Sequence, residues 1–220
     1  MCALYNDFMN NQIYYKAQIR LNLIIVSFTI VGILFMLTTP SEPGSLQAEG
    51  LGNLKFYTVL SNVFCGIVSL IYVFFILAGR DTAKLSSFKL AAVCGVAITF
   101  AVVAFFFGPL YGYPQFYKRG NLFFHLLEPV LAMAEFIIIR RKPIPFRGAL
   151  IAAVPTLLYG TGYMLNILIN GIGGPWPYTN DFYAFLSWGW PVGILIFCGI
   201  TLTAFAAACL FRFISNKRAI

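Results

Sequence analysis

Six apolar runs, each close to the length that crosses a bilayer, constrain this chain more than any other feature. The runs cover residues 21–37, 54–77, 88–107, 122–139, 148–167 and 188–213. A transmembrane helix needs about 20 mainly apolar residues, and segments rich in Pro and Gly separate the runs. We therefore predict an all-α polytopic fold, in which residues 1–220 form one integral membrane domain built as a six-transmembrane-helix bundle.

The composition supports this class and excludes others. Hydrophobic residues make up 60% of the chain and charged residues only 10%, whereas soluble domains carry about 25% charged residues. The formal net charge of +8 comes from basic residues that flank the apolar runs, so we assign it to membrane topology and anionic lipids and expect no nucleic-acid partner. A polar stretch from Asn6 to Arg20 precedes a full-length first run, unlike a cleaved signal peptide, so we expect this run to be retained.

The distribution of Lys and Arg predicts the orientation in the membrane. Four regions that alternate along the chain, and so face one side, hold twelve of the fifteen basic residues: Lys16, Arg20, Arg80, Lys84, Lys89, Arg140, Arg141, Lys142, Arg147, Arg212, Lys217 and Arg218. The other side holds Lys55, Lys118 and Arg119. We predict a multi-pass protein of the cell membrane with both termini in the cytoplasm.

The cysteines and the acidic residues give no sign of a cofactor. Five cysteines lie at the N-terminus or inside the apolar runs, at Cys2, Cys65, Cys94, Cys198 and Cys209. Their spacing does not match that of zinc ligands, and no second set of His or acidic ligands occurs at metal spacing. We predict no disulfide, no metal and no organic cofactor.

Polar residues follow one face of three predicted helices, because residues three or four apart share a helical face. The second run carries Thr58, Ser61, Asn62, Cys65 and Ser69; the fourth carries His125, Glu128 and Glu135; the fifth carries Thr156, Tyr159, Tyr163, Asn166 and Asn170. Lipid penalises unsatisfied polar groups, so these faces should turn toward one another. The predicted topology brings Thr58, His125 and Tyr163 to a similar depth in the outer half of the bundle.

His125 and Glu128 are the most informative of these residues. A titratable side chain near the bilayer centre costs roughly 2.5–3.5 kcal/mol or more, so it points to function by default. Thr58 and His125 are the parts of a covalent acyl-transfer site, with the hydroxyl as nucleophile and the imidazole as base. Asn62, Tyr163 or Asn166 could donate hydrogen bonds to an oxyanion, and Glu128 could orient the His125 ring.

Other interpretations remain open at this stage. Hydroxyl and amide side chains often only bridge membrane helices, and Glu135 could pair with Arg140 or Arg141. A proton-coupled carrier would instead use His125, Glu128 and Glu135 as a relay along one helix. A lipid-binding or scaffold protein without catalysis is a third alternative. The loop from Thr38 to Asn53 is long enough to act as a lid over the outer end of the bundle.

Three strings carry a resemblance to a known family. They are Phe56-Tyr57-Thr58-Val59-Leu60-Ser61-Asn62, His125-Leu126-Leu127-Glu128-Pro129, and more weakly the stretch from Tyr163 to Pro177-Tyr178 that precedes Asp181. With these strings and its six spans, the chain resembles the bacterial Pr-six-Pr membrane proteins and, more distantly, the androgen-induced-protein family of membrane hydrolases. In that second branch the resemblance implies hydrolysis of fatty acid esters of hydroxy fatty acids by a Thr and a His, which match Thr58 and His125.

The resemblance also predicts the substrate and the supporting residues, and this chain departs from the hydrolase branch at two points. It implies a lipid or fatty acyl ester as substrate, with Ser61, Asn62, Tyr163 and Asp181 in supporting positions. The spacing from His125 to Pro129 is that of the bacterial branch, and Glu128 has no counterpart that can be carried over from the hydrolases.

Overall fold

The computed structural model is an all-helical bundle, and it describes residues 2–40, 48–139, 141–175 and 178–219, with backbone alone for 2–13. Helices account for 80% of it. Within these ranges six helical segments are long and apolar enough to cross a membrane, namely Tyr14–Thr38, Tyr57–Leu77, Thr82–Tyr111, Gly120–Ile138, Phe146–Asn170 and Trp190–Lys217. The chain is thus built as a multi-pass membrane protein, and each predicted run corresponds to one of these segments.

The long helices are α1 (Cys2–Thr38), α2 (Tyr57–Leu77), α3 (Ser86–Val102), α6 (Glu128–Ile138), α7 (Phe146–Asn170) and α8 (Trp190–Lys217). Short elements are α4 (Gly108–Tyr111), α5 (Gly120–Leu122) and the 3₁₀ turns η1 (Gly50–Lys55), η2 (Thr82–Leu85) and η4 (Tyr113–Gln115). Two five-residue π-helical turns, η3 (Val103–Phe107) and η5 (Phe123–Leu127), continue α3 and precede α6. The polar stretch before the first apolar run is helical as well, since it belongs to α1.

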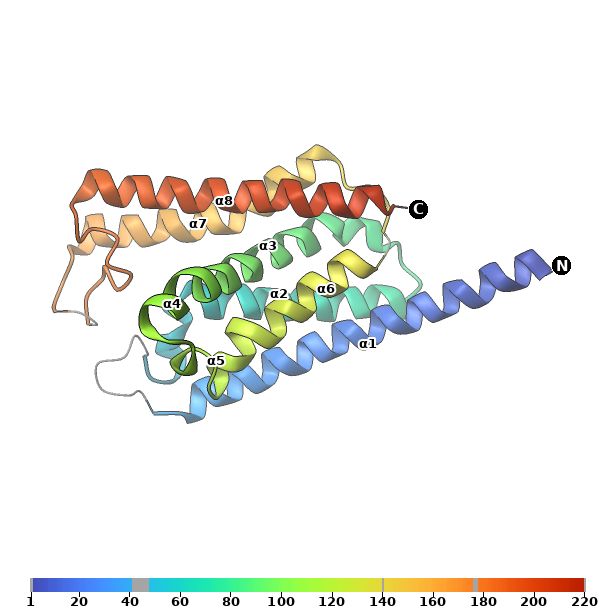
Figure 1. Ribbon diagram of the computed structural model, residues 1–220, viewed down its shortest axis with the longest axis horizontal. Coiled ribbons are helices and arrows are strands. Elements are labelled where there is room, and N and C mark those ends of the chain that lie inside the picture. The colour runs from blue at the N-terminus through green and yellow to red at the C-terminus, as the bar shows by residue number, and fades with distance from the viewer. Residues whose placement is uncertain (1, 41–47, 140, 176–177, 220) are drawn as a thin grey trace.

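Helix α3 is the centre of the bundle. It contacts α2, α6, α7 and α8, while α1 packs on α2 and α6. Figure 1 shows α7 and α8 side by side along one edge, with both chain termini at the same end of the molecule. We call this end, with the loop 78–85 and the described part of the loop after α6, the terminal end. The opposite end, with residues 48–56, the loop 112–119 and the described part of the loop after α7, is the long-loop end.

Two prolines explain the two wide turns. Pro109 follows η3 by two residues and Pro129 follows η5 by two residues. Proline has no N–H, and its ring crowds the carbonyl one turn earlier, so the preceding turn widens. The Gly108 N–H accordingly bonds to the Val103 oxygen, and the Glu128 N–H bonds to the Phe123 oxygen, each across five residues.

Each wide turn leaves one backbone carbonyl without its helical partner, because the next N–H in the five-residue pattern would belong to proline. In both turns a side chain takes the place of that donor. The Tyr113 hydroxyl donates to the Ala104 oxygen at 2.9 Å, and the Asn62 amide donates to the Phe124 oxygen at 2.9 Å. The two wide turns are therefore stabilised by the same arrangement.

The predicted lid is described only in part, because residues 41–47 lie outside the described ranges. In the remaining part, the Asn53 side chain accepts from the Ala48 N–H and donates to the Ala48 and Gly50 oxygens. This local structure leads directly into α2.

Candidate functional site

His125 lies in the wide turn η5 and is buried, with 9% of its surface exposed. Its Nδ1 atom is 3.0 Å from the Phe116 backbone oxygen, and the two rings are in edge contact. A carbonyl oxygen can only accept, so Nδ1 carries the proton and Nε2 presents its lone pair. The loop 112–119 thus fixes the tautomer that a general base requires.

Thr58 lies in the first turn of α2 and is half-buried. One turn further on, the Asn62 Nδ2 atom donates to the Thr58 oxygen at 2.7 Å and to the Phe124 oxygen at 2.9 Å. This amide joins the turn that carries Thr58 to the residue next to His125. In the described residues, however, no hydrogen bond joins the Thr58 hydroxyl to the imidazole.

The expected oxyanion donors are already engaged. Both N–H bonds of Asn62 are used as described above, and the Tyr163 hydroxyl donates to the Asp181 Oδ1 atom at 2.6 Å. Asn166 is exposed and accepts from Asn170. The Thr58 N–H, by contrast, has no hydrogen bond among the described residues, and it lies at the positive end of the α2 dipole.

Ser61 faces α3 rather than η5. Its hydroxyl oxygen is 3.1 Å from the Thr99 hydroxyl oxygen and 3.1 Å from the Thr58 backbone oxygen. Ser61 therefore holds α2 against α3 beside Thr58.

Glu128 is fully buried, and neither of its carboxyl oxygens has a hydrogen bond among the described residues. The Thr29 hydroxyl lies near this carboxyl but donates to the Ile25 oxygen at 3.0 Å. The ring of His125 is oriented by Phe116 and not by this carboxyl. The wide turn between the two residues explains why a spacing of three does not make them partners.

Tyr163 and Asp181 belong to a second polar group, on the α7 side of the long-loop end. Asp181 accepts from the Tyr163 hydroxyl and from the N–H groups of Phe185 and Leu186. The Tyr183 hydroxyl in the same loop accepts from the Tyr57 N–H at 2.9 Å. The carboxylate organises the loop after α7, and the loop in turn caps α2 one residue before Thr58.

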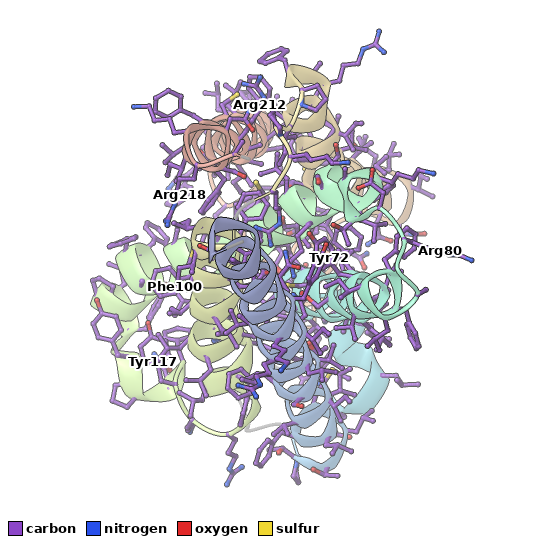
Figure 2. All side chains as sticks on the ribbon, turned by 90° about the vertical axis from the view of Figure 1, so that its right-hand side faces the viewer. Tyr72, Arg80, Phe100, Tyr117, Arg212 and Arg218 are labelled. Atoms are coloured by element: carbon purple, nitrogen blue, oxygen red, sulfur yellow. The ribbon has the colours of Figure 1, made fainter. Side chains whose placement is uncertain are left out.

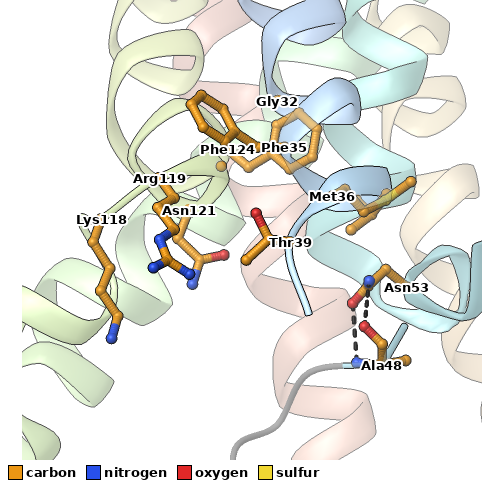
Figure 3. A pocket seen from close by; sticks show the side chains of 12 residues that line it. Gly32, Phe35, Met36, Thr39, Ala48, Asn53, Lys118, Arg119, Asn121 and Phe124 are labelled. Carbon is orange, nitrogen blue, oxygen red and sulfur yellow. Dashed lines mark hydrogen bonds between the residues drawn. The ribbon is translucent and has the colours of Figure 1, made fainter. Parts of the chain in front are cut away.

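A hollow of about 70 Å³ opens at the long-loop end between the end of α1, η1 and α5. Figure 3 shows Arg119 and Asn121 on one wall, Asn53 on another and Thr39 between them. Phe124, the neighbour of His125, lies at its base. Thr58 and His125 do not line this hollow.

The terminal end contains a buried group of charges that we call the ionic cluster; its members are Asn22, Ser69, Lys89, Glu135 and Arg141. Glu135 lies 2.6 Å from the Arg141 Nη2 atom and 3.6 Å from the Lys89 Nζ atom. The predicted pairing of Glu135 with Arg141 is confirmed, and Arg140 lies outside the described residues. Lys89 also donates to the Asn22 Oδ1 atom at 2.6 Å and to the Ser69 hydroxyl at 2.8 Å.

Aromatic rings and backbone oxygens complete this cluster. The Arg141 guanidinium donates to the Phe136 and Ile139 oxygens at the end of α6 and lies 4.8 Å from the Phe136 ring centre. The ring of Tyr72 lies within 5.8 Å of the Lys89 ammonium. Figure 2, which looks at the terminal end, shows Tyr72 inside the bundle, whereas Arg80 points away from it.

Lys89 is an exception to the predicted topology, in which it belongs to the loop between two spans. It lies within α3 and is fully buried. Asn22 in α1 was not singled out at all, although it contacts both Lys89 and Glu135. The positions of Asn22 and Lys89 in the sequence do indicate a buried role, because each is a polar residue within the first turns of an apolar run.

Groups of three or more His, Cys, Asp or Glu side chains suited to a metal do not occur in the described residues. The comparisons with known proteins gave no match: no family model, curated protein or solved structure corresponds to this chain.

Proposed function

We propose that this protein is a membrane-embedded hydrolase of lipid-like esters, in which Thr58 is the nucleophile and His125 the base. The observation that carries the proposal is the hydrogen bond from His125 Nδ1 to the Phe116 oxygen. A buried imidazole held in one tautomer, with a free Nε2 lone pair, is ready to accept a proton. The resemblance to the androgen-induced-protein hydrolases, based on its short motifs, supports the same pair of residues.

The reaction would proceed in two steps. In the first, His125 Nε2 removes the Thr58 hydroxyl proton while Oγ1 attacks the ester carbonyl carbon, and the proton then passes to the departing alcohol. In the second, His125 activates a water that hydrolyses the acyl-threonine and releases a fatty acid. The unpaired Thr58 N–H at the start of α2 would stabilise the negative oxygen in both steps.

The ionic cluster favours this proposal over the carrier. A proton relay needs a carboxyl that can change its charge, whereas Glu135 is held between Arg141 and Lys89. Glu135 is therefore better explained as a structural counter-ion. The Glu128 carboxyl has no hydrogen-bond partner in the described residues, so no continuous hydrogen-bonded path joins it to His125 or to Glu135 there.

We further propose that the protein lies in the cell membrane with both termini in the cytoplasm. The basic residues gather at the terminal end, where both chain ends lie, and the long-loop end has only Lys55, Lys118 and Arg119. A C-terminal fusion to green fluorescent protein should fluoresce in a bacterial host, while a fusion to alkaline phosphatase should be inactive. The reverse pattern would contradict the orientation.

Covalent labelling tests the catalytic proposal. The purified protein is treated with a hydrophobic fluorophosphonate, and mass spectrometry locates the adduct. We expect modification of Thr58, loss of the adduct in His125→Ala, and partial labelling at the same position in Thr58→Ser. Thr99→Ala is the matched control, because it removes a buried hydroxyl on the neighbouring helix and should label normally.

Folding and transport controls separate the alternatives. Each variant must elute as the wild type does on size exclusion in detergent. Labelling that persists in Thr58→Ala, or that never occurs in a correctly folded protein, would contradict the hydrolase. Proton flux in vesicles that is lost in Glu128→Gln would instead favour the carrier.

A further inference from the structure

A second hollow, of about 390 Å³, lies between α2, α3 and α7. It is within the size range of small-molecule sites, about 300–1,000 Å³. Its walls include Tyr57, Ser61, Ala91, Gly95, Leu158 and Tyr159. All of these lie inside membrane-spanning segments, so the medium around this hollow is lipid and not water.

Small residues of α3 form one wall of the hollow. Helices α2 and α7 both pack on α3, which contributes Ala91 and Gly95 to the lining. At Gly95 helix α2 approaches closely, since a Cβ there would lie 3.3 Å from the Ser61 Cβ atom. At the rim, Leu60 is 40% exposed and Leu158 is 66% exposed. The hollow therefore opens sideways, between two leucines that face the acyl chains of the membrane.

A band of hydroxyl groups borders the apolar space. The Tyr57 and Thr156 hydroxyl oxygens are 2.7 Å apart, and the Tyr159 hydroxyl donates to the Lys55 oxygen at 2.7 Å. When Thr156 donates within this pair, the O–H of Tyr57, which lines the hollow, remains for another acceptor. Beyond this band the wall is apolar, formed by residues such as Phe64 and Leu158.

We infer that this hollow binds an acyl chain of an ester lipid, which enters sideways between α2 and α7 and places its ester group at the hydroxyl band. An acyl chain matches the apolar wall and the lateral opening, and an ester oxygen can accept the remaining O–H. The inference deepens the proposed function and rests on it, because the bound ester would be the substrate of Thr58. Thr58 follows Tyr57 in α2, and its side chain points ~100° further around the helix axis.

Photocrosslinking tests this site. The probe is methyl palmitate that carries a diazirine in mid-chain and an alkyne at its end, added to the full-length protein in phosphatidylcholine vesicles. We expect crosslinks to gather on residues 57–64, 88–95 and 155–159 and to be competed by excess methyl palmitate. Crosslinks spread evenly over the exposed apolar surface would overturn the inference.

A matched pair of tryptophan variants sharpens the test. Leu158→Trp obstructs the rim, whereas Leu168→Trp places the same ring on an equally exposed site of α7 outside the hollow, since Leu168 is 61% exposed. We expect about tenfold less crosslinking in Leu158→Trp, because small steric changes in an apolar pocket alter binding by roughly that factor. No change in Leu168→Trp is expected, and equal yields in both variants would contradict the site.

Two further measurements keep this inference separate from the catalytic one. Ala91→Phe fills the hollow from α3 and should shift crosslinking toward shorter probes; if this variant does not fold, the surface variant Leu158→Trp still decides the question. Crosslinking in Thr58→Ala measures binding without turnover. Saturable crosslinking in the hollow with no hydrolysis by the wild type would support the lipid site and contradict the hydrolase.

Discussion

The two ends of the bundle satisfy their buried polar groups in different ways. At the terminal end, the Glu135 carboxylate is held by two cations, Lys89 and Arg141, and Asn22 of α1 hydrogen-bonds to both Lys89 and Glu135. At the long-loop end, backbone carbonyls freed by prolines are bonded by neutral side chains, and both the His125 Nε2 atom and the Thr58 N–H remain without protein partners in the described residues. An ion-paired cluster supports stability, whereas free donors and acceptors at a buried imidazole and a helix start are what a chemical site requires.

The largest expected effect is the loss of stability on substitution of Glu135, which tests whether the ionic cluster stabilises the terminal end. Glu135→Gln would leave two buried cations without a counter-ion, which costs about 3–5 kcal/mol. Thermal unfolding in detergent, followed by size exclusion, should show a marked loss of stability. Glu128→Gln is the matched control, because that carboxyl has no hydrogen bond to lose, and it should be neutral or slightly stabilising. Equal losses in the two variants would refute the distinction.

Lys89→Met should have a smaller effect than Glu135→Gln. It removes one cation and leaves the Glu135–Arg141 pair intact and neutral. The loss comes from the charge-assisted hydrogen bonds to Asn22 and Ser69, about 1.5–3 kcal/mol. The same unfolding assay measures this loss. A loss greater than that of Glu135→Gln would show that the Lys89 cation contributes more to stability than the Glu135 carboxylate does.

A double-mutant cycle tests the arrangement at the long-loop end. Asn62→Leu deprives the Phe124 oxygen of its donor and should cost about 0.6–1.7 kcal/mol, the range found for hydrogen bonds between membrane helices. Pro129→Ala restores an N–H that can bond this oxygen within the helix, so the cost of Asn62→Leu should fall in that background. Additive effects would mean that the proline does not free this carbonyl. In addition, Pro129→Ala should lower fluorophosphonate labelling, because it rotates His125.

The smallest effect concerns the exposed pair at the terminal end, Asp81 and Lys142. The Lys142 ammonium at 2.9 Å, together with the Ala83 N–H, holds the pKa of Asp81 below its ordinary value. A lowered folded-state pKa contributes stability above the ordinary pKa, and this contribution is lost as the pH falls through the lowered value. Lys142→Ala should therefore shift the unfolding midpoint slightly at pH 7 and less at strongly acidic pH. An equal shift at both pH values would exclude this ion pair as the cause.

Hydropathy and spacing predict the spans and the polar faces well, because lipid imposes both on the sequence. They do not predict which polar residues become partners. The spacing of His125 and Glu128 indicates a shared face, but Pro129 widens the turn between them. Lys89 resembles a flanking charge because it is close to a span end, yet partners from α1 and α6 hold it inside. The Phe116 oxygen depends on the course of an irregular loop, in which Gly112 and Arg119 adopt positive φ angles.

The wide turn before Pro129 has a consequence for how this helix can change through evolution. The extra residue in the turn offsets the residues before it from the residues after it around the helix axis, so His125 and Glu135 meet different neighbours although they belong to one membrane-spanning segment. Substitutions around His125 can therefore alter the candidate site while Glu135, several turns deeper, keeps its contacts to Lys89 and Arg141.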